Sequence, residues 1–125
     1  MNQQATRGDT AATQEVLAHH LEFFSKLDLA GTMADYADEA TFISQGGVLH
    51  GSNAIRQFFG HCLRNSRSRG CPSICSSRKV DGDTAYMVWT AESADNVFEI
   101  GTDTFIVQNR KIVTQTFAGK ITPKS

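Results

Sequence analysis

The side chain best suited to moving a proton is Asp103, which interrupts a stretch of alternating apolar positions. Residues two apart in a strand share one face, so Gly101, Asp103, Phe105 and Val107 are predicted to lie together. A carboxyl group among such neighbours loses solvent, and desolvation raises its pKa. An acid of raised pKa is suited to proton transfer near neutral pH. The alternative is that Asp103 bonds a helix terminus or lies at a wet rim.

A second candidate is His20, which follows His19 in a stretch of helical periodicity. Adjacent helical residues point about 100° apart, so the two imidazoles cannot clamp one metal ion. His20 falls on the apolar stripe, where it either polarises a substrate oxygen or is a satisfied core histidine. Tyr36 is predicted on a helix beside Met33, with its hydroxyl either at a pocket mouth or in contact with a ligand.

Several classes of function are not favoured by the composition. Twelve basic and 13 acidic residues give a net charge of −1, which provides no general attraction to nucleic acid or anionic membrane. No apolar run approaches the roughly 20 residues of a membrane span. A basic cluster without interleaved aromatic residues does not indicate nucleic-acid binding; it comprises Arg64, Arg67, Arg69, Arg78 and Lys79.

Metal, cofactor and secretion signals are also weak. Cys71 and Cys75 are separated by three residues rather than two, and no second pair follows. No His/Cys/Asp spacing resembles a metal site, and no glycine-rich phosphate loop opens a helix, so we expect neither a metal nor a cofactor. Three cysteines cannot all pair within one chain, and the first ten residues are polar rather than a secretory signal. We therefore expect a cytoplasmic protein with reduced thiols.

The remaining pattern defines the elements that position these side chains. Residues 1–9 are predicted to be a disordered tail, and residues 10–121 a single domain. Helices are predicted over 10–27, capped by Asp9 or Thr10, over 29–38, capped by Asp28, and from Ser52 onward. The buried face of the third helix is predicted to hold Ile55, Phe58, Phe59, Cys62 and Leu63. Strands are predicted over 40–44, 48–49, 72–80, 83–93, 97–108 and 111–121.

Three helices before an antiparallel meander predict an α+β fold in which the helices cover one face of a curved sheet. Such a sheet leaves a hollow of the kind that binds ligands. If Ala94 pairs with Val97, then Val88 lies opposite Asp103 and Thr90 opposite Gly101. The other face would carry Met87, Trp89, Phe98, Ile100, Thr104 and Ile106. Because a large exposed apolar face is unusual in a monomer, we expect a homodimer through this outer face, with Trp89 in the interface.

Four segments resemble the nuclear-transport-factor-2-like superfamily, in its SnoaL-like and ketosteroid-isomerase-like branch. The resemblance covers about residues 11–119 and implies a cone-shaped cup, the cystatin-like α+β barrel, and a homodimer. The segments are Asp28-Leu29-Ala30-Gly31, Tyr36-Ala37-Asp38-Glu39-Ala40-Thr41-Phe42, Gly51-Ser52-Asn53-Ala54-Ile55-Arg56-Gln57-Phe58-Phe59 and Gly101-Thr102-Asp103-Thr104-Phe105, the last followed by Arg110-Lys111-Ile112.

The resemblance also implies roles for individual residues. Asp103 occupies the place of an aspartate that is kept protonated and donates a hydrogen bond to a developing enolate in the isomerases. Ser44, or Gln45, stands where those enzymes have a carboxylate base, and His20 where they have a tyrosine. The resemblance directs Gln115 and Phe117 of the last strand inward.

We therefore expect a cup that binds a small, partly apolar carbonyl compound and performs cofactor-free proton transfer, as in isomerisation or aldol-type cyclisation. Asp103 and His20 are the candidate catalytic residues. The candidate substrate-binding residues are Tyr36, Ser44, Val88, Thr90, Phe105, Gln115 and Phe117. A non-catalytic dimeric binding module with the same cup is the first alternative, and a dimerisation domain whose pocket is filled by phenylalanine is the second.

Overall fold

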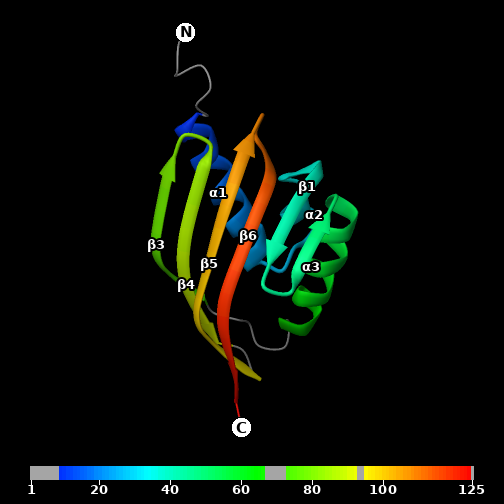
Figure 1. The fold of residues 1–125 in the computed structure, drawn as a ribbon, viewed down its shortest axis with the longest axis vertical. Helices are drawn as coiled ribbons and strands as arrows, with labels where there is room; N and C mark the ends of the chain where they lie inside the picture. The colour runs from blue at the N-terminus through cyan, green and yellow to red at the C-terminus, as the bar shows by residue number, and fades with distance from the viewer. Residues whose placement is uncertain (1–8, 67–72, 93–94, 125) are drawn as a thin grey trace.

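The protein is described by a computed structural model that covers residues 9–66, 73–92 and 95–124, with side chains described for 9–61, 76–92 and 95–124. Within these residues, three helices pack on a curved six-stranded sheet, which confirms the predicted α+β class (Figure 1). The helices are α1 (Thr10–Ser25), α2 (Leu29–Met33) and α3 (Ser52–Ser66). The strands are β1 (Tyr36–Ser44), β2 (Gly47–His50), β3 (Ser73–Asp81), β4 (Thr84–Glu92), β5 (Asn96–Gln108) and β6 (Lys111–Pro123).

The first helix begins and ends close to its predicted bounds. The carboxylate of Asp9 accepts hydrogen bonds from the backbone N–H groups of Ala11 and Ala12, at 2.9 and 3.2 Å, and so caps α1. Of the predicted tail, residues 1–8 lie outside the described residues. The buried stripe of α1 carries His20 into the core, together with Thr13, Val16 and Leu17.

The second helix is shorter than predicted. Asp28 caps it as expected, accepting from the backbone N–H of Gly31 at 2.9 Å, but the helix ends at Met33. Tyr36 therefore lies on β1, and its predicted place on the helix is wrong. The reason is tertiary: Tyr36 pairs with Ile112 of β6, a partner 76 positions away that local periodicity does not reveal.

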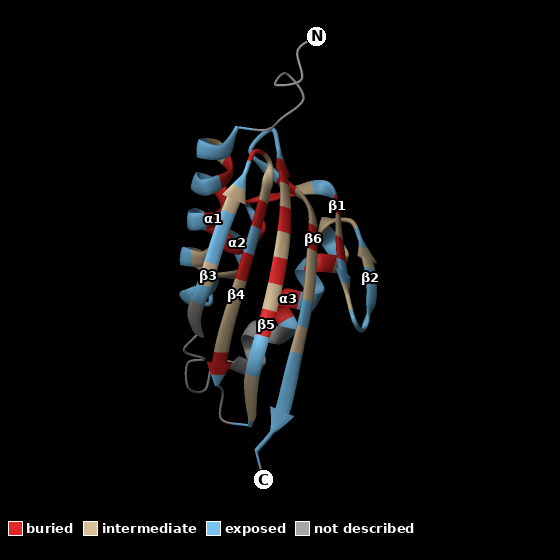
Figure 2. Ribbon diagram, turned by 60° about the vertical axis from the view of Figure 1, so that its left-hand side comes forward, coloured by how far each residue is buried: buried red, intermediate tan, exposed pale blue. Residues whose placement is uncertain are grey.

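The sheet has the order β2-β1-β6-β5-β4-β3, and β1 runs parallel to β6 while the other neighbours are antiparallel. Figure 1 shows α1 crossing behind the strands and α3 beside β1 and β2, so the helices cover one face, here termed the inner face. The core lies between this face and the helices. Along β4 and β5, buried and less buried residues alternate, as a half-covered sheet requires (Figure 2).

The register between β4 and β5 differs by one residue from the prediction. Glu92, not Ala94, pairs with Val97, and a bulge then places an additional β5 residue between Phe98 and Gly101. A slip of one residue moves every side chain of a strand to the other face. Met87 and Trp89 consequently lie on the inner face, opposite Asp103 and Gly101 respectively.

The third helix contributes fewer large side chains to the core than predicted. Ile55 and Phe59 are buried, but Phe58 is 37% exposed. The side chains of Cys62 and Leu63 lie outside the described residues. The buried inner-face residues that receive this helix and α1 are Ala85, Met87, Phe105, Val107 and Ile112.

Candidate active site

Four polar side chains form a continuous hydrogen-bonded row through the core, here termed the buried row: Asp103, Gln115, Tyr36 and His20. The amide nitrogen of Gln115 donates to Oδ2 of Asp103 at 2.8 Å, and the hydroxyl of Tyr36 donates to the Gln115 carbonyl. Nε2 of His20 lies 3.4 Å from the Tyr36 hydroxyl. All four residues are buried, so the row is a polar path between β5 and α1 inside an apolar core.

At one end of the row, Asp103 accepts a hydrogen bond on each oxygen. The indole Nε1 of Trp89 donates to Oδ1 at 2.7 Å, opposite the Gln115 bond to Oδ2. Burial raises the pKa of the Asp103 carboxyl, and these two hydrogen bonds oppose that rise without cancelling it. The surroundings of this carboxyl group therefore agree with the predicted direction of the shift.

The tryptophan reaches Asp103 because Gly101 has no side chain. A Cβ at Gly101 would lie 2.4 Å from two atoms of the Trp89 indole, so the ring occupies the space that a side chain at this position would need. The indole also stacks on Phe117, with ring centroids 6.0 Å apart and planes inclined by 21°. Trp89 thus belongs to the inner face, and its predicted place in an outer interface is wrong.

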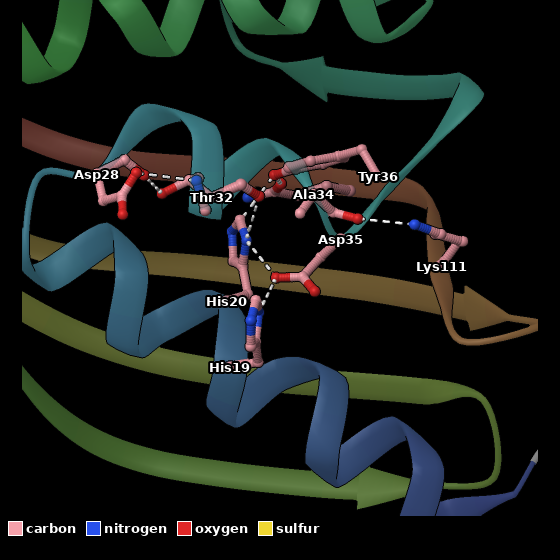
Figure 3. Close-up of polar contacts among 10 residues, drawn as sticks. His19, His20, Asp28, Thr32, Ala34, Asp35, Tyr36 and Lys111 are labelled. Atoms are coloured by element: carbon pink, nitrogen blue, oxygen red, sulfur yellow. Dashed lines mark hydrogen bonds and ion pairs between the residues drawn. The ribbon is translucent and has the colours of Figure 1, made fainter.

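At the other end, His20 is enclosed by helices and aromatic rings. Its Nδ1 lies 3.3 Å from the carbonyl oxygen of Thr32 and 3.8 Å from Oδ2 of Asp35 (Figure 3). The rings of Tyr36 and Phe105 have their centroids 5.3 and 5.6 Å from that of the imidazole. Burial lowers the pKa of His20 to about 4, and the nearby Asp35 carboxylate offsets only part of this effect.

A carboxylate links this end of the row to the surface. Oδ2 of Asp35 lies 2.8 Å from Nδ1 of His19, whose side chain is 44% exposed (Figure 3). Burial also raises the pKa of Tyr36 well above its ordinary value, with additional contributions from the Asp103 and Asp35 carboxylates. The Tyr36 hydroxyl therefore keeps its proton and acts as a hydrogen-bond donor.

The predicted site residues divide into two groups. Phe105, Gln115 and Phe117 share the inner face with Asp103, as the strand pairings show. Val88 pairs with Thr102 on the opposite face, and Thr90, two residues along β4, points the same way, so their predicted place beside Asp103 is wrong. The cause is the one-residue slip between β4 and β5. Substrate binding by the inner-face residues stays a prediction.

Ser44 lies on the inner face, where it pairs with Phe117. Its hydroxyl accepts a hydrogen bond from the backbone N–H of Gly46 at 3.2 Å and so closes the turn between β1 and β2. Trp89 is a residue of the site that the sequence pattern did not place beside Asp103. The signal for it was Gly101, since a strand glycine often marks the close approach of a large neighbour.

The described side chains contain no cluster of three or more His, Cys, Asp or Glu residues that could hold a metal ion. Among the described helices, none is long and apolar enough to cross a membrane. The expectation that the protein uses neither a metal nor a cofactor stays a prediction.

Comparison with known proteins identifies the fold. The family model of the SnoaL-like domain matches residues 16–115. None of the curated proteins matches the chain. An NTF2-like protein of unknown function from Mesorhizobium loti is similar in structure, with a TM-score of 0.77, 22% identity, and coverage of 89% of this chain and 93% of that one.

Two further structures carry functional names. A putative ketosteroid isomerase from Kribbella flavida has a TM-score of 0.75 at 12% identity, covering 90% of this chain and 81% of the other. An LEH-like epoxide hydrolase from M. tuberculosis has a TM-score of 0.70 at 15% identity, covering 89% and 84%. At these identities, the likeness shows a shared fold but does not show a shared activity.

Proposed function

The chain belongs to the SnoaL-like domain family, and on that premise we propose that it catalyses cofactor-free proton transfer on a small, partly apolar carbonyl compound. The observation that carries the proposal is the Asp103 carboxyl, which is buried, has a raised pKa and has no cation bonded to it among the described side chains. A desolvated carboxyl group of raised pKa is a better proton donor and acceptor pair than an ordinary surface aspartate.

An ionised Asp103 carboxylate would have acceptor positions that its two hydrogen bonds do not use. An ionised carboxylate offers about four acceptor sites, and Trp89 and Gln115 occupy one on each oxygen. A remaining lone pair can accept the proton from the carbon beside a substrate carbonyl. The electron pair of that C–H bond then forms the enolate, and return of the proton to another carbon completes an isomerisation.

The surroundings favour an apolar substrate body. Met87 and Phe117 pair with Asp103 from the two neighbouring strands, and the Trp89 indole adjoins the carboxyl. The putative ketosteroid isomerase among the structural neighbours supports this reaction class by its printed name alone. We extend that class, rather than any particular substrate, to this chain.

A direct test is the exchange of substrate C–H protons with solvent deuterium. A panel of small enolisable ketones is incubated with the protein in D2O, and exchange beside the carbonyl is followed by proton NMR. We expect protein-dependent exchange that falls by about 10²- to 10⁴-fold in Asp103→Asn. The matched control is Asp38→Asn, an exposed carboxyl on β1. Unchanged exchange in Asp103→Asn contradicts the proposal.

A second candidate is a non-catalytic binding module that uses the same inner face. It is favoured by Ser44, since a hydroxyl that closes a turn stands where the resembling isomerases have a carboxylate base. For this candidate, a ligand that binds tightly is recovered unchanged from D2O, with no deuterium beside its carbonyl.

We also propose that the outer sheet face forms a homodimer. Along the middle of β4, β5 and β6, this face carries no charged side chain, and Tyr86 is 42% exposed on it. Its residues are Tyr86, Val88, Thr102, Thr104, Ile106, Thr114 and Thr116. In sedimentation velocity, Thr104→Lys is expected to yield monomer, whereas Val48→Lys on the edge strand β2 leaves the dimer intact. A wild-type monomer at every concentration contradicts this proposal.

A further inference from the structure

The buried row constrains where its protons lie, beginning at His20. Nδ1 of His20 faces two groups that accept hydrogen bonds, the carbonyl oxygen of Thr32 at 3.3 Å and the Asp35 carboxylate at 3.8 Å. A carbonyl oxygen cannot donate, so Nδ1 carries a proton. In a neutral imidazole, Nε2 is then an acceptor, and it faces the Tyr36 hydroxyl.

The opposite end of the row imposes a conflicting demand. When Asp103 is ionised, it accepts a hydrogen bond from the amide nitrogen of Gln115. The Gln115 carbonyl then faces Tyr36 and accepts the hydrogen bond of its hydroxyl. Tyr36 has only one proton, so it cannot also donate to His20. Lone pairs of the Tyr36 oxygen and His20 Nε2 then face each other across 3.4 Å, unless the imidazole carries a second proton.

Two arrangements satisfy every contact of the row. In the ion-pair arrangement, Asp103 is ionised, the imidazole is doubly protonated, and His20 donates to Tyr36. In the neutral arrangement, the Gln115 amide is rotated by about 180°, so that its oxygen and nitrogen exchange places. The Asp103 hydroxyl then donates to the Gln115 carbonyl. The amide nitrogen then donates to Tyr36, and Tyr36 donates to Nε2 of His20. Both contain the same number of protons, and they differ by one proton transferred from Asp103 to His20.

We infer that Asp103 and His20 share one proton through Gln115 and Tyr36, so that His20 is the positioning residue that sets the protonation state of Asp103. Loss of this proton from the pair leaves one contact of the row unsatisfied. Leaving a buried polar group unsatisfied is unfavourable because the group has lost its water without gaining a partner. The row therefore resists ionisation of Asp103 beyond what desolvation alone accounts for.

Of these two arrangements, burial favours the neutral one over the ion pair. Burial disfavours the charged form at both ends, lowering the pKa of His20 and raising that of Asp103. The charged or titratable groups that face His20 are Asp35, His19 on its own helix and Tyr36; the other rings against it belong to Phe59 and Phe105. Asp103 faces Trp89, Gln115 and Tyr36. The ion pair is favoured by the Asp35 carboxylate and the Thr32 carbonyl at the His20 end, and by the hydrogen bonds from Trp89 and Gln115 at the Asp103 end.

The inference rests on the proposed function only for its use, which is to return a proton to Asp103 between turnovers. It is tested without substrate, on the full chain, by nitrogen-15 NMR of the His20 imidazole and carbon-13 NMR of the Asp103 carboxyl over one pH titration. We expect the imidazole signals to shift in a step at the midpoint of the carboxyl titration. Imidazole signals that stay constant through that midpoint overturn the inference.

Three variants separate a relay from electrostatics through space. Asp103→Asn keeps the size of the side chain and is expected to abolish the step. Tyr36→Phe removes the hydroxyl from the row and is expected to uncouple the two titrations. His19→Gln, outside the row, is the matched control and is expected to retain the step. A full-sized step in Tyr36→Phe overturns the inference, and so does persistence of the step in Asp103→Asn.

The result is separate from that of the deuterium-exchange assay. Coupled titrations without catalysed exchange leave the shared proton intact and contradict the proposed function. Catalysed exchange that depends on Asp103, with uncoupled titrations, supports the proposed function and contradicts the shared proton.

Discussion

The two ends of the buried row lie in similarly dry surroundings, with His20 at 3% and Asp103 at 8% exposure, yet burial acts on their pKa values in opposite directions. It lowers the pKa of the base and raises that of the acid. At each end a polar partner opposes the effect: Asp35 beside His20, and Trp89 and Gln115 beside Asp103. Burial in one apolar core therefore favours the uncharged form of both an imidazole and a carboxyl group.

The largest expected effect is a dependence of the free energy of unfolding on pH that is caused by His20. Because the pKa of His20 is about 4 in the folded protein against 6.5 ordinarily, the unfolded chain binds more protons between these values. The contribution to stability is complete above pH 6.5 and is lost as the pH falls toward 4, about 3 kcal/mol in all. Chemical denaturation of the wild type at several pH values measures this loss.

His20→Gln is expected to remove this pH dependence, whereas His19→Gln, at a 44% exposed position, is expected to retain it. The difference in free energy of unfolding between the wild type and His20→Gln is compared at each pH. A difference that stays constant between pH 6.5 and 4 contradicts the assignment of a buried neutral imidazole.

A somewhat smaller effect is expected from Gly101→Ala, which acts at the Asp103 end. The added Cβ would lie 2.4 Å from the Trp89 indole, so the ring must move and its hydrogen bond to Asp103 is disturbed. We expect a loss of about 1–3 kcal/mol in the free energy of unfolding. Gly46→Ala is the control, because its Cβ would meet only the Ser44 hydroxyl at 3.7 Å. Equal stability of the two variants contradicts the close packing of Trp89 on Gly101.

The smallest expected effect is the pH dependence of stability in Asp103→Asn relative to the wild type. A carboxyl of raised pKa favours folding most at low pH, and this contribution is lost as the pH rises from 3.8 through the pKa of the folded state. An asparagine does not ionise, so its stability relative to the wild type is expected to improve over that range. Parallel stability profiles of the two proteins from pH 3 to 8 contradict a raised pKa.

The sequence pattern was sufficient for features that depend on local period. Helical spacing placed His20 on the buried stripe of α1, and strand alternation placed Asp103 on one face with Phe105. The row itself was not predictable in this way. It depends on the parallel pairing of Tyr36 with Ile112, a contact between distant segments.

The partner of Asp103 on β4 was missed for a related reason. The pairing of Glu92 rather than Ala94 with Val97, together with a bulge near Glu99, shifts the register by one residue, which exchanges Val88 for Met87 and Thr90 for Trp89 on the inner face. Bulge positions are not marked by composition, so strand parity alone gave the wrong face. Gly101 indicates that a large side chain lies opposite it, but identifying that side chain as Trp89 also requires the pairing of Glu92 with Val97.

The proposed acid–base role depends most on the pKa of the Asp103 carboxyl, which a carbon-13 NMR titration measures, with Asp103→Asn to assign the signal. We predict a midpoint above the ordinary 3.8, because burial outweighs the hydrogen bonds from Trp89 and Gln115. In Trp89→Phe, which removes the indole N–H, the midpoint is expected to rise further. A wild-type midpoint at or below 3.8 would show a solvated or ion-paired carboxylate, and the proposed acid–base role would then be contradicted.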